Sequence, residues 1–386
     1  MSAASAGPAY DLDAWRARIP LLASCIPMNN CSQAPQTAAT RAAAERYLDS
    51  WNERGMDWDA WLAEVALAKA EFSTLIGAAP SDIAVFSSVS EAASAVASAL
   101  DLSGRRRGIA VSDAEFPTVA HVWLAQAPRG ARVSFARVCD GTIDPTAYDT
   151  LIDDRTALVS ACHGYYANGF IQDVRRIAAQ ARDAGALSFV DAYQTLGVVP
   201  VDVRALGVDF LTSGNLKFLM GMPGIAFLYV RPEVVGSLHP TVTGWFGRAD
   251  PFASTARALD WSPTASRFDT GTPPVMSAYV ARAGMEVINA IGPSKIRAWH
   301  EVLGQRLIEG GRSRGLRLHG ADDMARKTAT TAFLVPDPGA VERAMRARGV
   351  LPTARGEVLR LAPHFFTTIE DVDRALDLLA ELAPGR

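Results

Sequence analysis

The sequence predicts an α/β protein whose core is a mainly parallel sheet of seven strands. Two observations lead to this fold class. Short runs of β-branched and apolar residues recur between positions 83 and 230, and helical patterns separate most of them. Such alternation is typical of a parallel sheet that helices cover on both faces. The predicted strands are 83–88, 108–113, 132–138, 156–163, 186–192, 208–213 and 224–230.

The segments between and before these strands have helical patterns. Residues 90–100, 117–127 and 172–185 combine apolar positions at helical spacing with few glycines or prolines. Two further helical segments, 37–51 and 59–77, precede the first strand. We therefore expect helices on both faces of the sheet.

The composition and the secondary-structure pattern of the sequence change after about residue 235. Loops rich in glycine, proline and threonine are followed by a long helical stretch near 275–312, short strands and a closing helix. This order predicts a smaller α+β domain. We expect a large domain at 20–270 and a small domain at 271–386, joined by the N-terminal segment 1–19.

Bulk composition excludes several classes of protein. The 386 residues are 49% hydrophobic and 20% charged, with a formal net charge of −3, so we expect a globular protein that does not bind nucleic acid. No apolar run has the length of a membrane span, and the first residues do not resemble a signal peptide. Four scattered cysteines and six histidines lack metal-ligand spacing. We predict a cytoplasmic protein without a metal or membrane partner.

Lys217 is the only charged residue between positions 212 and 230. It lies between two predicted strands and beside glycines, which allow close approach of a backbone or a ligand. In an open parallel sheet, ligands bind beyond the carboxyl ends of the strands. This position predicts a functional lysine.

Other polar and aromatic residues follow neighbouring strands. The segment 87–92 begins a helix and suits a phosphate, Phe116 follows another strand, and Asp191 and Gln194 follow a third. Taken singly, each residue is compatible with a helix cap or the core. Together they match the needs of pyridoxal phosphate (PLP), which requires a lysine for a Schiff base and a carboxylate for the pyridinium nitrogen.

The stretch "FVDAYQTLGVVPVDVRALGVDFLTSGNLKFLMGMPGIAFLYVRP" resembles the core of the class V aminotransferase family. The resemblance extends from "MNNCSQAP" at 28–35 to "LRLAPHFFTTIEDVD" at 359–373. This family has the PLP-dependent transferase fold type I and includes cysteine desulfurases, selenocysteine lyases, kynureninases and isopenicillin-N-epimerase-like enzymes. The resemblance therefore implies this fold and this cofactor.

The resemblance also implies roles for particular residues. Lys217 forms the Schiff base, and Arg360 grips the substrate carboxylate, which a bidentate guanidinium suits. Residues near the PLP phosphate of the neighbouring subunit imply a homodimer with shared active sites. The implied cofactor-binding residues are Asp191, Gln194, Ser90, Val89, Ser88, Phe116 and Ser213, with Gly271 and Thr272 from that subunit. Candidate substrate-pocket residues are Asn30, His163, Tyr165, Tyr166, Trp245, Arg248 and His364.

Departures from the family pattern narrow the chemistry. Residue 216 is leucine where the family commonly has a histidine, and the segment 348–360 lacks the nucleophilic cysteine of desulfurases. Cys31 is a candidate near the substrate, but we favour the interpretation that it is a packed free thiol. The missing cysteine argues against a cysteine desulfurase. The resemblance of the chain to selenocysteine-lyase-like proteins favours a β-eliminating C–S lyase that acts on an α-amino acid through a Cα carbanion. The alternatives are an aminotransferase, an epimerase or decarboxylating deaminase variant, and a PLP-binding protein without turnover.

Overall fold

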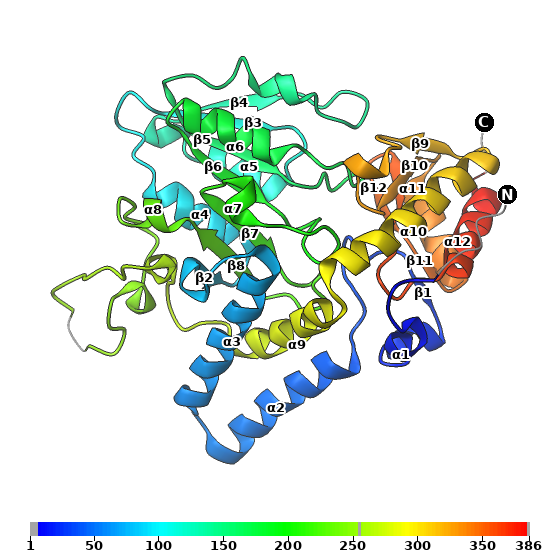
Figure 1. The fold of residues 1–386 in the computed structure, drawn as a ribbon, viewed down its shortest axis with the longest axis horizontal. Helices are drawn as coiled ribbons and strands as arrows, with labels where there is room; N and C mark the ends of the chain where they lie inside the picture. Colours follow the sequence, from blue (N-terminus) through cyan, green and yellow to red (C-terminus); the bar gives the residue numbers. More distant parts are fainter. Residues whose placement is uncertain (1–6, 254–255, 384–386) are drawn as a thin grey trace.

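The computed structural model describes residues 7–253 and 256–383. Outside these ranges lie residues 1–6 of the predicted segment 1–19, residues 254–255 of the predicted large domain and residues 384–386 of the predicted small domain. The large domain is built around a sheet with strand order β2-β8-β7-β6-β5-β3-β4 (Figure 1). The strands are β2 (Ile83–Phe86), β3 (Gly108–Ser112), β4 (Arg132–Ala136), β5 (Thr156–Cys162), β6 (Leu187–Asp191), β7 (Phe210–Gly214) and β8 (Ala226–Val230).

All seven predicted strands are present, and the predicted fold class is confirmed. Strand β8 runs antiparallel to both of its neighbours, while β7, β6, β5, β3 and β4 are parallel. Nearly every residue of β6, β7 and β8 is buried, as expected for strands that are covered on both faces. Because β5, β6 and β7 are parallel, the side chains that follow them gather at one edge of the sheet.

Helices lie on the two faces of the sheet (Figure 1). The buried apolar side chains form two separate cores. On one face, Phe72 stacks on Phe227 with ring centroids 4.7 Å apart, and on the other face Trp123 packs edge-on against Phe189. The helices of this domain are α2 (Ala38–Arg54), α3 (Trp58–Ile76), α4 (Val89–Ala99), α5 (Pro117–Leu124), α6 (Val174–Asp183), α7 (Val203–Leu206) and α8 (Pro232–Val235).

The small domain pairs an antiparallel sheet with helices. Its strand order is β12-β13-β10-β9, from Thr353–Arg355, Val358–Leu361, Thr331–Leu334 and Arg317–His319. The helices are α10 (Pro293–Ser313), α11 (Pro338–Ala347) and α12 (Ile369–Leu382), and α9 (Val275–Ile291) packs against α2 and α3 of the large domain. Within the described ranges, no helix is long and apolar enough to cross a bilayer.

The N-terminal segment lies against the small domain (Figure 1). Strand β1 (Ile26–Pro27) pairs in parallel with β11 (Val350–Leu351). The short helix α1 (Leu12–Arg16) is fixed nearby, because Arg16 donates to the Phe366 carbonyl and forms an ion pair with Asp371 at 2.8 Å. The small domain is therefore contacted both by α1, from the predicted segment 1–19, and by β1, from the first residues of the predicted range 20–270.

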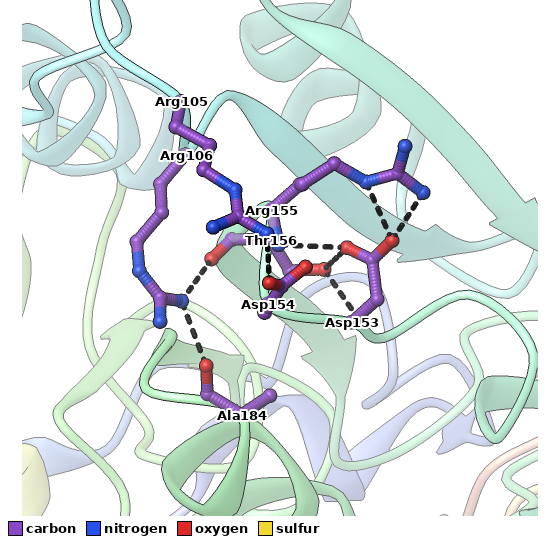
Figure 2. A network of polar contacts seen from close by, with 7 residues as sticks. All are labelled: Arg105, Arg106, Asp153, Asp154, Arg155, Thr156 and Ala184. Carbon is purple, nitrogen blue, oxygen red and sulfur yellow. Dashed lines mark hydrogen bonds and ion pairs between the residues drawn. The ribbon is translucent and has the colours of Figure 1, made fainter.

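The amino edge of the parallel sheet carries a polar network far from Lys217 in sequence (Figure 2). Arg106 donates to the carbonyls of Thr156 and Ala184 at 3.1 and 2.7 Å, so it ties β5 to the end of α6. Arg105 forms an ion pair with Asp154, and Arg155 forms one with Asp153. These arginines are occupied by backbone and carboxylate partners, which indicates a structural role.

Candidate active site

A cavity of about 320 Å³ lies where β6 and β7 end and the small domain meets the large one. It brings together residues that are far apart in the sequence, from the N-terminal segment to β13. Predicted residues in its wall are Lys217, Asp191, Gln194, Ser90, Val89, Phe116, Tyr166 and Arg360. Its other lining residues are Cys31, Ser32, Thr118, Val119, Cys162, Gly164, Tyr193, Leu216 and Arg355.

Lys217 follows β7 by three residues and points into this cavity. Its Nζ lies 3.9 Å from the centroid of the Tyr193 ring and 5.6 Å from that of Phe116. Burial lowers the pKa of Lys217 to about 8, and the nearby Asp191 carboxylate opposes this shift. The amine is therefore easier to deprotonate than an ordinary lysine and is available as a base or nucleophile.

Asp191 is the last residue of β6 and holds a buried carboxylate beside Lys217. Its Oδ1 accepts a hydrogen bond from the backbone N–H of Tyr193 at 2.8 Å. Burial raises the pKa of Asp191, while the Tyr193 N–H and the Lys217 ammonium partly counter this rise. A buried carboxylate that gains a cationic partner would be held in its charged form.

The start of α4 forms another part of the wall. Ser88 caps the helix, because its Oγ accepts the N–H of Glu91 at 3.2 Å. Val89 and Ser90 then occupy the first turn, where backbone N–H groups have no partner within the helix and the helix dipole favours an anion. Ser90 Oγ lies 3.4 Å from Thr118 Oγ1, so two hydroxyls accompany these N–H groups.

Arg360 reaches the cavity from β13 of the small domain and is only 1% exposed. Its Nη1 donates to the Tyr166 carbonyl at 2.5 Å, and its Nη2 donates to Ser32 Oγ at 3.1 Å. Nε is buried and has no hydrogen-bond partner among the described residues. No described carboxylate forms an ion pair with Arg360, so the guanidinium can receive an anionic ligand.

Several predicted substrate residues lie outside the wall of this cavity. Asn30 donates to the carbonyls of Pro27 and Ala362, which fixes the N-terminal segment. His163 shares a 2.9 Å hydrogen bond with Thr195, and burial lowers the pKa of His163 to about 4. His364 hydrogen-bonds to the Phe218 carbonyl. Tyr165 packs edge-on against Tyr166, so it supports a lining residue.

The remaining predicted residues lie elsewhere. Ser213 donates to the Gly214 carbonyl in its own strand. Gly271, Thr272 and Arg248 line a second cavity of about 470 Å³, and Trp245 packs against Trp58 nearby. This larger cavity also contains Lys69, but that amine forms an ion pair with Asp269 at 2.9 Å. It therefore offers no lysine comparable to Lys217.

Sequence reasoning did not identify Tyr193, Thr118, Cys162 or Arg355 as lining residues. Tyr193 lies two residues after Asp191, and its ring packs close to Gly214, where a Cβ would overlap it. This close approach is a physical reason for glycine at the end of β7. Cys31, a candidate from the sequence, lines the cavity and is only 1% exposed. Among the described residues, no group of three or more His, Cys, Asp or Glu could hold a metal ion.

The chain is similar in sequence and in fold to known proteins. Residues 32–350 match the family "Aminotransferase class-V". The chain is 36% identical over 368 residues to the uncharacterized aminotransferase YcbU of Bacillus subtilis, covering 95% of this chain and 96% of that protein. It is 27% identical over 373 residues to a kynureninase of Pseudomonas fluorescens, covering 92% and 88%. A cysteine desulfurase structure from Thermococcus onnurineus superposes with a TM-score of 0.87 at 24% identity, covering 98% and 99%.

Proposed function

We propose a function from one premise: the chain belongs to the class V aminotransferase family of PLP-dependent enzymes, which act in amino-acid metabolism. The proposed reaction is β-elimination of a sulfur substituent from an α-amino acid, so the protein would be a C–S lyase. The observation that carries the assignment to an amino acid is the shared cavity of Lys217, Asp191 and Arg360.

The residues present fit PLP. The Lys217 amine has a lowered pKa and suits the aldehyde, and the buried Asp191 carboxylate suits a pyridinium nitrogen. Phe116 offers a ring face within the same cavity, and the first turn of α4 offers N–H groups for a phosphate. Gln194 also lines the cavity, although its amide already donates to the Cys31 carbonyl at 3.0 Å.

When bound, PLP supplies an electron sink for negative charge at Cα of the substrate. The chain would supply the remaining functions. Arg360 binds the α-carboxylate and orients the amino acid, because its guanidinium suits a bidentate contact. Lys217 Nζ takes the proton from Cα, which its lowered pKa favours. The products of elimination would be a thiol, a keto acid and ammonia, with water consumed in the hydrolysis.

The segment before Arg360 supports elimination over persulfide formation. Strands β11 to β13 and their connections, residues 350–361, contain no cysteine, and Arg355 is the member of this segment beside Arg360 in the cavity wall. Cys31 and Cys162 also line the cavity. The Cys162 thiol is engaged with the Ala114 carbonyl and the Gln172 amide, and burial raises its pKa. A protonated, hydrogen-bonded thiol is a poor nucleophile.

An aminotransferase is the second candidate, and the 36% identity to YcbU favours it. The same residues would serve this reaction, because it also begins with removal of the Cα proton. The two candidates differ in the fate of the cofactor. A transaminase stops after one turnover unless a keto acid is present, whereas a lyase continues.

The deciding experiment adds single amino acids and cysteine S-conjugates to the purified protein without a keto-acid acceptor. The cofactor spectrum is recorded while keto acid is counted. Many equivalents of keto acid per site, with the visible band of the lysine-bound cofactor recovering, would support the lyase. One equivalent, with conversion to pyridoxamine phosphate, would establish the aminotransferase and overturn elimination.

The proposal includes a cytoplasmic homodimer with shared sites. Gly271 and Thr272 line a cavity different from that of Lys217, which is compatible with a contribution to the site of a second subunit. Aromatic side chains are exposed beside that cavity, including Phe252 at 57% and Trp245 at 36%. Sedimentation of the purified protein, with a Phe252→Ser variant for comparison, would test whether this surface joins two copies.

A further inference from the structure

We propose that the substrate carries a second anionic group on its side chain and that Arg355 binds this group. The inference rests on the proposed function, since it names the class of amino acid that this site would accept. Two arginines of the small domain, Arg355 and Arg360, line the same cavity, and the proposed chemistry uses only Arg360.

The pairing of β12 with β13 places the two arginines on one face of the small sheet. Arg355 is opposite Val358, and Thr353 is opposite Arg360. Residues two apart in a strand share a face, so Arg355, Val358 and Arg360 all face the same way. Diagonal neighbours of this kind lie roughly 7–8 Å apart, with their Cβ atoms somewhat closer. Two guanidinium groups at this spacing can bind two anionic groups of one small molecule.

The charges in the cavity wall leave Arg355 without a counterion. The acidic and basic side chains that line the cavity are one carboxylate, that of Asp191, and the three basic groups of Lys217, Arg355 and Arg360. Asp191 lies close enough to Lys217 to affect its pKa, and the α-carboxylate of an amino acid would occupy Arg360. Both arginines also act electrostatically on Lys217, which indicates that they lie near it.

Arg355 differs from its neighbours in the small domain. Arg346 forms an ion pair with Glu342 at 2.9 Å, and Arg348 forms one with Glu381 at 2.6 Å. The backbone of Arg355 belongs to the β12–β13 pair, but within the described part of the chain its side chain has no hydrogen-bond or ion-pair partner. It is exposed, as expected for a residue at the mouth of the cavity that meets the ligand from solvent.

The class of ligand follows from this arrangement. A guanidinium recognises carboxylate and sulfur oxyacid groups through two parallel N–H donors. The proposed phosphate site has its own donors at the start of α4, so the cofactor does not require Arg355. The substrate would be an amino acid, or an S-conjugate of cysteine, with a carboxylate or sulfonate on its side chain.

The test uses titration calorimetry of the PLP-loaded protein with acids that lack an amino group and cannot react. Succinate and 3-sulfopropionate carry two anionic groups, and butyrate carries one. We expect either dianion to bind at least about tenfold more tightly than butyrate, with the preferred one identifying the side-chain group. Equal affinities for all three acids would overturn the inference.

Variants assign the effect to one residue. Arg355→Gln should remove the preference for dianions and leave butyrate affinity unchanged, while Arg355→Lys should keep part of the preference. Arg348→Gln is the matched control, because it removes a paired surface arginine of the same domain and should change nothing. A preference for dianions that survives in Arg355→Gln would remove Arg355 from the site.

The result can be separated from the fate of the proposed function. If Lys217 holds the cofactor but dianions bind no better than butyrate, only the substrate class is wrong. If the Lys217→Ala protein keeps the visible cofactor band, the proposed function itself fails.

Discussion

Lys217 and Lys327 are both buried lysines, but Lys217 lies in the candidate active site and Lys327 lies in the protein interior away from it. Burial lowers the pKa of Lys217 to about 8 and that of Lys327 to about 7. Lys327 is 1% exposed, donates to Thr331 Oγ1 at 3.0 Å and does not line the cofactor cavity. Lys217 faces a cavity, a carboxylate and two aromatic rings.

The comparison shows that a shifted pKa alone does not identify a catalytic lysine. The shift for Lys327 is the larger of the two, yet its amine is already hydrogen-bonded inside the protein. What separates Lys217 is space for a ligand and an acidic partner at the ends of parallel strands.

Replacing Lys217 should have the largest effect. Lys217→Ala should abolish the visible band of the lysine-bound cofactor and lower turnover by about 10⁴-fold, because it removes both the anchoring amine and the base. Absorption spectra and steady-state rates measure the two effects. Lys327→Met is the matched control and should retain the band. If Lys327→Met lost the band while Lys217→Ala kept it, the roles would be reversed.

Asp191→Asn should have the next largest effect. The amide cannot hold a proton on the cofactor ring by charge, so kcat/KM should fall by about 10²–10³-fold. Asp209→Asn is the control: it is a buried aspartate at the start of β7, paired with Arg231 at 2.6 Å. That variant should lose stability in urea but keep its specific activity. Equal losses of activity would show that Asp191 acts only through folding.

The rate at which the apoprotein captures PLP should depend on pH through Lys217. Only the neutral amine attacks the aldehyde, so the rate should rise about tenfold per unit below pH 8 and level off above it. Stopped-flow absorbance between pH 6 and 10 measures this dependence. A rate that still rises steeply at pH 10 would indicate an ordinary, solvated lysine.

The buried amine of Lys327 should make the free energy of unfolding depend on pH. Its pKa of about 7 in the folded protein is below the unfolded value of 10.5, so between these values the unfolded chain binds more protons and stability rises with pH. From pH 7 to 9 this contribution is about 2–3 kcal/mol. The stability difference between wild type and Lys327→Met, from urea unfolding of the PLP-loaded protein, should change by that amount. An unchanged difference would place the Lys327 pKa near that of a surface lysine.

Much of the large domain was predictable because local and global signals agree there. The strands are apolar, short and separated by helical patterns, and each predicted strand has its counterpart in the sheet. The convergence of Lys217 and Asp191 was also predictable, since Asp191 lies at the carboxyl end of one strand and Lys217 lies just after the neighbouring parallel strand. Their catalytic roles stay predictions until the spectra are measured.

Other features depend on pairing that sequence order does not reveal. Strand β1 contributes only two residues, and its partner β11 lies more than three hundred residues later. Arg355 carries no local signal, because its place beside Arg360 follows from the register of β12 and β13. Lys327 was missed for a similar reason: its surroundings come from distant segments, including an isolated bridge to Phe170.

The hydrogen bonds of Arg360 to Tyr166 and Ser32 reduce the entropic cost of binding a ligand at this residue. An arginine that swings freely in solvent must lose rotational freedom when it binds, which opposes association by about 0.5–1.5 kcal/mol for each such side chain. The Arg360 side chain is already immobilised before a ligand binds, because it is hydrogen-bonded to Tyr166 and Ser32. When a carboxylate binds, the loss of conformational freedom would therefore fall mainly on the ligand. Arg360 would act as a preorganised binding group.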